Sequence, residues 1–494
     1  MVKDIHDKNS LGNHPSLGHS GGHVYGMMAM NDILYFAAQD IEDNELWRSD
    51  GTESGTYMVK NIRSNYSFGI GQTAYLNQSQ PRFMVNYGNN IYFRALGDSG
   101  GFELWKSDGT ESGTVMAKDI WPGGFGSNPY HLELVGDVIY MRADSSSYGE
   151  ELHAFDISNG TSWLVKDINS GSSDSGVGPF FAIGSSVYFS ATDGTHGQEL
   201  WKSDGTSSGT FMVKNINPTN TTYGGSYPQK FATLDGNLFF IANDGSGNAV
   251  WKSDGTEAGT VMLKNYSNNF KINGNYIYIN DGDGKLWRSD GTITETVLIT
   301  DNHSVFDFYP TNDSIYIVEK TLNPTIYSLW KFDKTNSGFK ELVTGFSSMS
   351  QLFTIEDTLY FKGDDGTHGD ELWRSDGTIA GTVLAADIAN GSDGSSIGLN
   401  FEFSTMPWKA QKIGNTLYFR ADDKVHDAEL WAYDLGTNLA SYEVTGSTCT
   451  ISPALPSGLN FDTGTCTISG TPSVVTSNTT YTCLLYTSDA ADEL

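Results

Sequence analysis

The sequence predicts an all-β protein, a β-propeller of about eight or nine four-stranded blades. Three observations predict it: one phrase returns nine times, two aromatic columns run in phase through the copies, and most copies carry an Asp-Gly turn between two short strands. The copies are spaced by about 48 residues, a period typical of repeat arrays. The clearest copies read ELWRSDGTESGTYMVKNI (from Glu45), ELWKSDGTESGTVMAKDI (from Glu103), ELWKSDGTSSGTFMVKNI (from Glu199) and ELWRSDGTIAGTVLAADI (from Glu371).

The anchor column of the repeat is a tryptophan in all copies but one. Its members are Trp47, Trp105, His153, Trp201, Trp251, Trp287, Trp330, Trp373 and Trp431. A second aromatic column lies upstream and consists of Tyr35, Tyr92, Tyr140, Tyr188, Phe239, Tyr278, Tyr316, Tyr360 and Tyr418. We expect the anchor tryptophans to be structural and buried between blades.

Each copy can be divided into four short strands, as the segment from Pro179 to Ile216 shows. Its strands are PFFAIGS, SVYFSAT, QELWKSD and TFMVKNI, rich in the aromatic and β-branched residues that suit a buried pleated surface. In the third strand Glu199 and Trp201 point to one face, while Leu200 and Lys202 point to the other. Both faces carry apolar groups, so each sheet must be covered on both sides, as a propeller blade is by its neighbours.

The third and fourth strands are connected by Ser-Asp-Gly-Thr. A tight hairpin needs positive φ at this point, which glycine adopts without steric cost. Backbone geometry therefore explains why the acidic turn recurs, and a catalytic role for its aspartate is the weaker alternative.

The repeated phrase resembles the ELWxxDGT repeat family of large secreted or surface-exposed bacterial proteins. The resemblance covers residues 1–436 and is clear in six copies. The other three depart from the pattern: His153 replaces tryptophan, the copy from Leu286 lacks the second Gly-Thr, and the copy from Leu329 lacks Asp-Gly. The resemblance implies a propeller-like extracellular repeat protein, and it carries over no catalytic residues.

A different composition follows from residue 437. The segment PALPSGLNFDTGTCTISGTP resembles an immunoglobulin-like domain of bacterial surface proteins, so we expect a partial β-sandwich at residues 437–482. Residues 483–494, CLLYTSDAADEL, resemble a translated sequencing adaptor, which makes Cys483 foreign to the natural sequence. Cys449 and Cys466 then remain, either as a disulfide, which suits a secreted protein, or as two free thiols.

The chain begins inside a repeat, because MVKDI matches the fourth strands YMVKNI (from Tyr57) and FMVKNI (from Phe211). The last copy, which ends at Leu435, lacks a fourth strand of its own. We therefore expect Met1 to Ile5 to complete the last blade and close the ring, with a ring of eight and one displaced unit as the alternative. A fragment that begins within a repeat shows no signal peptide, and we expect an extracellular or bacterial cell-surface location.

The charge excludes some partners. With 29 Lys and Arg against 59 Asp and Glu, the net charge is −30, which argues against nucleic acid and anionic membrane surfaces. No apolar run approaches the length of a membrane span, so no membrane insertion is expected. We expect a monomer.

Propeller topology sorts the loops. If the first strand of each blade is innermost, the second-to-third loops share one face with the long connections between blades, and ligands should bind there. Clustered aspartates with glycines suit Ca²⁺. We therefore predict calcium ligands at Asp193, Asp364, Asp365 and Asp370, and the DGDG segment from Asp281 is a further candidate.

Two functional classes remain. The first is a non-catalytic surface module for adhesion or scaffolding that binds glycans or surface proteins. The alternative is a carbohydrate-active hydrolase or lyase on a propeller scaffold, which needs two carboxylates that converge on the scissile bond. Because the acids recur at the same position of each copy, we favour the first class and expect no catalytic residues.

Overall fold

The computed structural model describes residues 1–5, 24–40, 44–63, 78–98, 100–123, 125–218, 224–300, 303–335, 337–399, 410–436, 448–452, 455, 459–462, 467–470 and 482–486. They belong to two compact units, Met1–Asp434 and Leu435–Leu494. We call the first the propeller unit.

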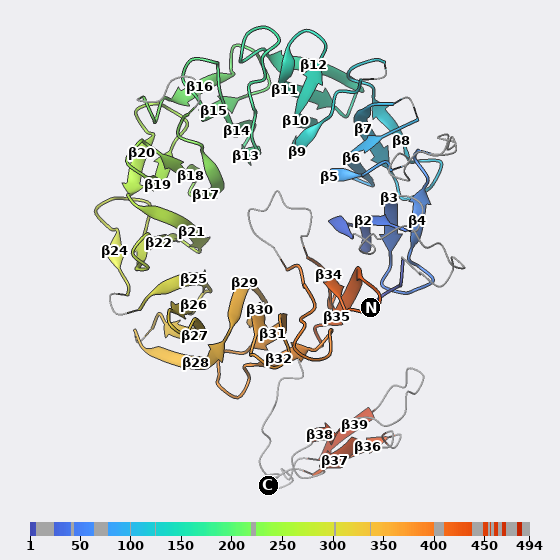
Figure 1. Ribbon diagram of the computed structural model, residues 1–494, viewed down its shortest axis with the longest axis vertical. Coiled ribbons are helices and arrows are strands. Elements are labelled where there is room, and N and C mark those ends of the chain that lie inside the picture. Colours follow the sequence, from blue (N-terminus) through green and yellow to red (C-terminus); the bar gives the residue numbers. More distant parts are fainter. Residues whose placement is uncertain are drawn as a thin grey trace, which may run out of the picture. The chain divides into compact units, whose positions relative to one another are not determined.

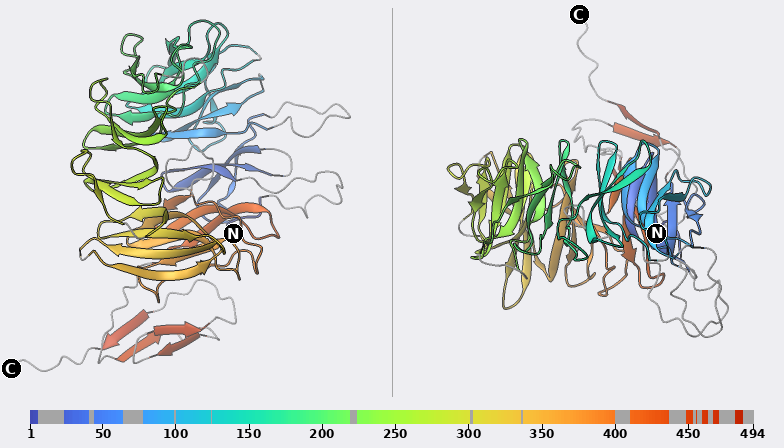
Figure 2. Two further views of the ribbon diagram at one scale, coloured as in Figure 1. Left: turned by 60° about the vertical axis from the view of Figure 1, so that its left-hand side comes forward. Right: turned by 90° about the horizontal axis from the view of Figure 1, so that it is seen from above.

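The propeller unit is a ring of nine blades, as predicted, numbered here in chain order (Figure 1). Blades 1 to 8 are four-stranded antiparallel sheets in which strand order follows chain order. The first strand of each blade lies nearest the centre and the fourth lies outermost (Figure 1). Seen edge-on, the unit is a thick disc (Figure 2).

Blades 1 to 3 contain β1 (Tyr25–Met30), β2 (Ile33–Gln39), β3 (Asn44–Ser49), β4 (Tyr57–Lys60), β5 (Arg82–Tyr87), β6 (Asn90–Leu96), β7 (Phe102–Ser107), β8 (Val115–Lys118), β9 (Tyr130–Val135), β10 (Val138–Ser145), β11 (Gly149–Asp156) and β12 (Thr161–Lys166). Blades 4 to 6 contain β13 (Phe181–Ile183), β14 (Ser186–Ala191), β15 (Glu199–Ser203), β16 (Phe211–Lys214), β17 (Gln229–Leu234), β18 (Asn237–Asn243), β19 (Asn248–Ser253), β20 (Val261–Lys264), β21 (Ser267–Asn273), β22 (Tyr276–Asp281), β23 (Leu286–Ser289) and β24 (Val297–Leu298). Blades 7 to 9 contain β25 (Val305–Pro310), β26 (Ser314–Thr321), β27 (Ile326–Asp333), β28 (Phe339–Phe346), β29 (Ser348–Ile355), β30 (Thr358–Asp364), β31 (Glu371–Ser375), β32 (Val383–Ala386), β33 (Gln411–Ile413), β34 (Thr416–Asp422) and β35 (Ala428–Asp434).

Each sheet is buried on both faces, as the alternation in its third strand predicts. In β15, Trp201 packs with Val177 and Leu152 on the side of blade 3, whereas Leu200 packs with Phe231 and Trp251 on the side of blade 5. The hydrophobic core is therefore divided into layers between neighbouring blades.

The anchor residues are more deeply buried in the blades that match the repeated phrase well than in most of the others. The tryptophans of blades 1, 2, 4, 5 and 8 are buried, with 6–8% of their surface exposed, and His153 is buried as well. Trp287, Trp330 and Trp431 are only half-buried. The prediction of buried anchors therefore holds for the regular blades and in part for the others.

The amino-terminal segment closes the ring, as predicted. The amide N of Val2 donates a hydrogen bond to the carbonyl O of Leu430 at 2.9 Å, and Lys3 lies opposite Leu430 as Lys60 lies opposite Leu46 in blade 1. Val2 and Leu430 also join one hydrophobic cluster with Trp47. All nine blades thus belong to one ring, and the alternative of an eight-membered ring is wrong.

A second set of contacts links neighbouring blades in one direction. The Nζ of Lys60 in blade 1 donates to the carbonyl O of Thr114 in blade 2 at 2.7 Å. The Nζ of Lys3 donates to the carbonyl O of Thr56 at 2.8 Å, which places the same contact between blade 9 and blade 1. In both places a lysine of the fourth strand forms a hydrogen bond with the backbone of the next blade.

The second unit contains two antiparallel strand pairs. Its strands are β36 (Thr448–Ser452), β37 (Leu459–Asp462), β38 (Thr467–Gly470) and β39 (Thr482–Tyr486), and β36 pairs with β39 while β37 pairs with β38. Cys466 lies outside the described residues, so its disulfide with Cys449 stays a prediction. Cys483 lies in β39, opposite Ile451. Within the described ranges, no helix has the length and apolarity needed to cross a bilayer.

Candidate functional site

The second-to-third loops and the connections between blades share one face, which we call the loop face. In blade 4 the amide N of Gln198 donates to the carbonyl O of Gly224 at 2.9 Å, and the amide N of Ser226 donates back to the carbonyl O of Gln198 at 2.8 Å. In blade 2 the amide N of Asn128 donates to the carbonyl O of Phe102 at 2.9 Å. The predicted sorting of loops is thus confirmed where they are described. The long connections are only partly described, because residues 64–77, 219–223 and 400–409 lie outside the described ranges.

The glutamates of the repeated phrase hold these connections. Glu199 is fully buried, and its carboxylate accepts hydrogen bonds from the amide N of Ile216 at 2.8 Å, the amide N of Asn217 at 3.2 Å and the Oγ of Ser226 at 2.6 Å. The other buried glutamates at this position are Glu45, Glu103, Glu151, Glu371 and Glu429. We call these six the motif glutamates.

Burial shifts the titration of the motif glutamates. Desolvation raises the pKa of Glu151 to about 7, although the amide groups of Ile168 and Asn169 oppose the shift. Desolvation also raises the pKa of Glu103, Glu199 and Glu371. Raised pKa values are typical of catalytic acids, but here they follow from burial, which outweighs the opposing effect of the backbone amides.

The Asp-Gly turns are closed by their own hydrogen bonds. In blade 1 the Oδ1 of Asp50 accepts the amide N of Thr52 at 2.9 Å and its Oγ1 at 2.7 Å, which lowers the pKa of Asp50. Gly51 has φ 91°, and a Cβ there would lie 2.3 Å from the hydroxyl of Tyr418 in blade 9. The turn therefore needs glycine both for its φ and for contact with the preceding blade.

Two of the predicted calcium ligands close turns of their own. The Oδ1 of Asp193 accepts the amide N of Thr195 at 2.9 Å, and its Oδ2 lies 2.8 Å from the Nδ1 of His196. Asp365 and His368 repeat this pair in blade 8 at 2.9 Å. Asp423 and His426 in blade 9 form a third copy at 2.7 Å, which was not predicted because the loop reads DDKVHD instead of DGTHG.

The other two predicted ligands lie close together in blade 8. Asp364 and Asp370 line a hollow of about 330 Å³. The Oδ2 of Asp370 already forms an ion pair with the Nζ of Lys362 at 2.8 Å, and the Oδ1 of Asp364 accepts the amide N of Gly366 at 2.8 Å. Asp193 lies in another blade. Among the described residues, no group of three or more Asp, Glu, His or Cys side chains is placed to hold a metal ion.

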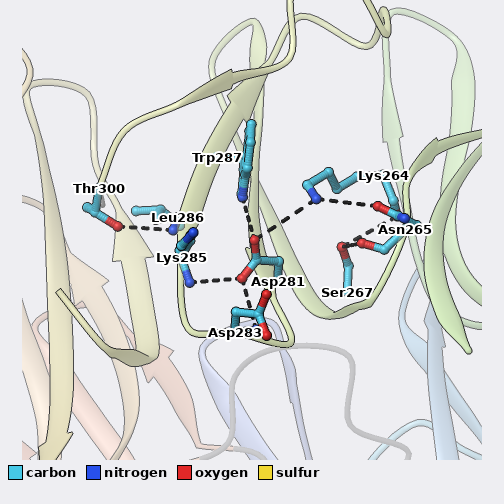
Figure 3. A network of polar contacts seen from close by, with 9 residues as sticks. All are labelled: Lys264, Asn265, Ser267, Asp281, Asp283, Lys285, Leu286, Trp287 and Thr300. Carbon is cyan, nitrogen blue, oxygen red and sulfur yellow. Dashed lines mark hydrogen bonds and ion pairs between the residues drawn. The ribbon is translucent and has the colours of Figure 1, made fainter. Parts of the chain in front are cut away.

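The DGDG segment forms a charge-compensated loop (Figure 3). The Oδ1 of Asp281 accepts the amide N of Asp283 at 3.1 Å and of Lys285 at 2.9 Å. Its Oδ2 accepts the Nε1 of Trp287 at 2.7 Å and lies 4.0 Å from the Nζ of Lys264. Protein donors thus already occupy the carboxylate that was a candidate for calcium.

A hollow lies on the loop face between blades 2 and 3, where no ligand-binding residue was predicted. The hollow has a volume of about 410 Å³ and is lined by Arg94, Phe102, Trp121, Phe125, Gly126, Asn128, Tyr130 and Asp144. The rings of Trp121 and Phe125 stack with centroids 5.6 Å apart and planes inclined by 22°. Phe125 is 83% exposed. A signal was present in Trp121, which lies outside the anchor column.

One family model matches the carboxyl-terminal region of the chain. The family model described as "Putative Ig domain" matches residues 426–493, so the carboxyl-terminal region carries an immunoglobulin-like domain. The match begins before residue 437, where we predicted the boundary. No curated protein matches the chain.

Solved structures resemble the chain only distantly. The computationally designed Ika8 protein is 14% identical, with a TM-score of 0.41 and coverage of 84% of this chain and 97% of that chain. Puromycin hydrolase is 12% identical, with a TM-score of 0.38 and coverage of 81% and 58%. BamB from Moraxella catarrhalis is 14% identical, with a TM-score of 0.37 and coverage of 71% and 96%. The propeller assignment therefore rests on the strand pairing of this chain.

Proposed function

We propose that this chain is a non-catalytic extracellular or cell-surface module of a bacterium, which binds glycans or surface proteins through its loop face. One observation carries the proposal: the acids that recur in most blades are used within the fold. The motif glutamates accept backbone amides, and the aspartates of the turns accept the amides and hydroxyls of their own turns. Such groups are not available to act on a substrate.

The proposal includes membership of the ELWxxDGT repeat family, which the repeated phrase supports. An extracellular location agrees with the immunoglobulin-like domain that follows the propeller unit. Calcium binding at the hollow of Asp364 and Asp370 belongs to the proposal as well, as one way to relieve the repulsion within a chain of net charge −30.

The alternative, a carbohydrate-active hydrolase or lyase, needs a carboxylic acid that is protonated near neutral pH and reaches substrate. Glu133 of β9 is the best candidate outside the motif glutamates, because desolvation raises its pKa to about 7. It accepts a hydrogen bond from the backbone of Ala182 in blade 4, which indicates an inter-blade contact. Glu133 therefore gives a direct test of the alternative.

The test compares binding through the two faces of the disc. Asp393 is exposed on the loop face and Asp357 is exposed on the face of tight turns, so each can be changed to cysteine and coupled to a bulky polymer. Wild-type chain treated with the same reagent is the reference, since it has cysteines of its own. Binding to arrays of polysaccharides and purified surface proteins should be blocked by the polymer at residue 393 and not at residue 357.

Equal binding by both coupled variants would contradict the role of the loop face. Turnover of any polysaccharide in the array that is abolished by Glu133→Gln would establish the enzymatic alternative instead.

A further inference from the structure

We propose that the hollow between blades 2 and 3 binds a carboxylate-bearing sugar residue of an acidic polysaccharide. The proposal rests on the binding function proposed above and names the ligand class for one site on the loop face. It is carried by a buried arginine whose expected acidic partner is replaced by a phenylalanine, and by the aromatic pair at the rim.

Equivalent positions of blades 2, 3 and 8 differ in how a basic side chain of the second strand is paired. In blades 3 and 8 a basic residue in the second strand pairs across the sheet with the acid that precedes the motif glutamate, whereas in blade 9 Arg420 holds that position and Ala428 precedes the glutamate. The Nε of Arg142 lies 3.3 Å from the Oε2 of Glu150 in blade 3, and the Nζ of Lys362 lies 2.8 Å from the Oδ2 of Asp370 in blade 8. In blades 3 and 8 a carboxylate of the same sheet therefore balances the positive charge of Arg142 or Lys362.

Blade 2 breaks this pattern. Arg94 occupies the position of Arg142, but Phe102 precedes the motif glutamate. The guanidinium carbon of Arg94 lies 3.8 Å from the centroid of the Phe102 ring and 4.4 Å from that of Tyr130. Stacking on rings stabilises the cation, but it does not supply the negative charge that a buried guanidinium needs.

Arg94 is deeply buried and incompletely paired. Only 5% of its surface is exposed, and its Nε and Nη1 have no hydrogen-bond partner among the described residues. Desolvation lowers its pKa and Arg82 acts in the same direction, while a hydrogen bond with the side chain of Tyr130 opposes the shift. A positive site of this kind is unusual in a chain of net charge −30, and an anion in the hollow would be attracted to it.

The remaining lining residues suit a sugar. The stacked rings of Trp121 and Phe125 offer an apolar surface against which the C–H face of a pyranose can pack. The Oδ1 of Asn128 is buried without a hydrogen-bond partner in the described part of the chain, so it can accept a sugar hydroxyl. Asp144, the one carboxylate in the lining, is a second acceptor. A volume of about 410 Å³ falls within the range of small-ligand sites.

The experiment measures binding to polygalacturonate and to its fully methyl-esterified form, which has the same backbone without the charge. Isothermal titration is done in a chelator, so that bridging by divalent cations is absent. We expect wild type to bind polygalacturonate and to bind the ester at least tenfold more weakly. Arg94→Met keeps an apolar stem of similar reach and should weaken polygalacturonate binding at least tenfold, and Trp121→Ala should weaken binding of both polymers.

The matched control is Arg374→Met, which removes the same charge from an exposed position in blade 8. It should leave binding unchanged. Melting temperatures of all three variants show whether the fold is retained, and Arg94→Lys, which keeps the charge, should retain part of the affinity even if Arg94→Met is unstable.

The outcomes separate this site from the proposed function. Equal affinity of wild type and folded Arg94→Met, or equal affinity for the acid and the ester, would overturn the site. If the chain then bound a neutral glycan or a purified surface protein through its loop face, the proposed function would stand. Failure to bind polygalacturonate and alginate, an unrelated polyuronate, would also overturn the site, and failure to bind any ligand on the arrays would overturn both.

Discussion

Blades 4 and 6 satisfy the same structural demand with different chemistry. In blade 4 Glu199 holds the connection to the next blade through the amide groups of Ile216 and Asn217. In blade 6 Lys285 takes the place of that glutamate, the amide N of Leu286 donates to the Oγ1 of Thr300 at 3.1 Å, and Asp281 organises the preceding loop (Figure 3). Both blades therefore provide side-chain acceptors for backbone amides at this position. The acceptor is a glutamate in blade 4 and a threonine in blade 6.

The largest expected effect distinguishes the anchor residues of these two blades. Trp201 is 6% exposed and Trp287 is only half-buried. Trp201→Ala should lower the free energy of unfolding by about 3–5 kcal/mol, the range for truncation of a large aromatic core residue. Trp287→Ala should cost less, and denaturant unfolding followed by circular dichroism measures both. A cost for Trp287→Ala as large as that for Trp201→Ala would contradict the comparison.

The next effect concerns the glutamate itself. Glu199→Ala removes the acceptor for three backbone amides and a serine hydroxyl, and we expect a loss of about 2–4 kcal/mol, since each buried unpaired donor costs about 1–3 kcal/mol. Lys285→Ala at the same position of blade 6 should change stability by less than about 0.5 kcal/mol, as for most surface substitutions. The same denaturant titration provides the measurement.

A third prediction uses the titration of Glu151, whose pKa is raised to about 7 by burial. A raised pKa means that the protonated form is favoured by folding. Its contribution to stability is complete below the ordinary pKa of about 4.5 and is lost as the pH rises through about 7. Glu151→Gln should therefore flatten the fall in melting temperature between pH 4.5 and pH 8.

The control for this prediction is Glu341→Gln, at an exposed position of β28. It should follow the wild-type pH profile. If Glu151→Gln also retained the wild-type profile, the burial of the motif glutamates would have no part in the pH dependence.

The smallest expected effect concerns calcium. If the hollow in blade 8 binds Ca²⁺, calcium should raise the melting temperature more than magnesium does at equal ionic strength. Asp364→Asn combined with Asp370→Asn should reduce that difference, whereas Asp281→Asn in blade 6 should not, because Asp281 lies outside the hollow. Equal responses to the two ions would leave only general screening of charge.

Much of the fold could be predicted from the sequence, because the residues that recur in the repeat are those that the turns and the buried strands need. The Asp-Gly pairs predicted the tight turns, and the alternation around Trp201 predicted sheets that are buried on both faces. The match of Met1 to Ile5 with other fourth strands predicted the closure of the ring. These signals are local or repeated nine times, so sequence spacing alone reveals them.

The sites were harder to predict, because they depend on contacts between blades and on departures from the repeat. Asp364 and Asp370 were expected together, but their partners Lys362 and Gly366 could be identified only from the structure. The hollow at Arg94 is marked by one departure, Phe102 in place of an acid, which could be recognised only by comparison with the ion pairs of blades 3 and 8.

The contacts from Lys3 to Thr56 and from Lys60 to Thr114 have a consequence for how such rings arise. They all run from one blade to the next, so each interface joins two unlike surfaces head to tail. Interfaces of this kind form a closed cycle only when the rotation at each step divides the circle. The propeller unit is in this respect a cyclic assembly whose subunits share one polypeptide, and its nine interfaces together must supply one full turn.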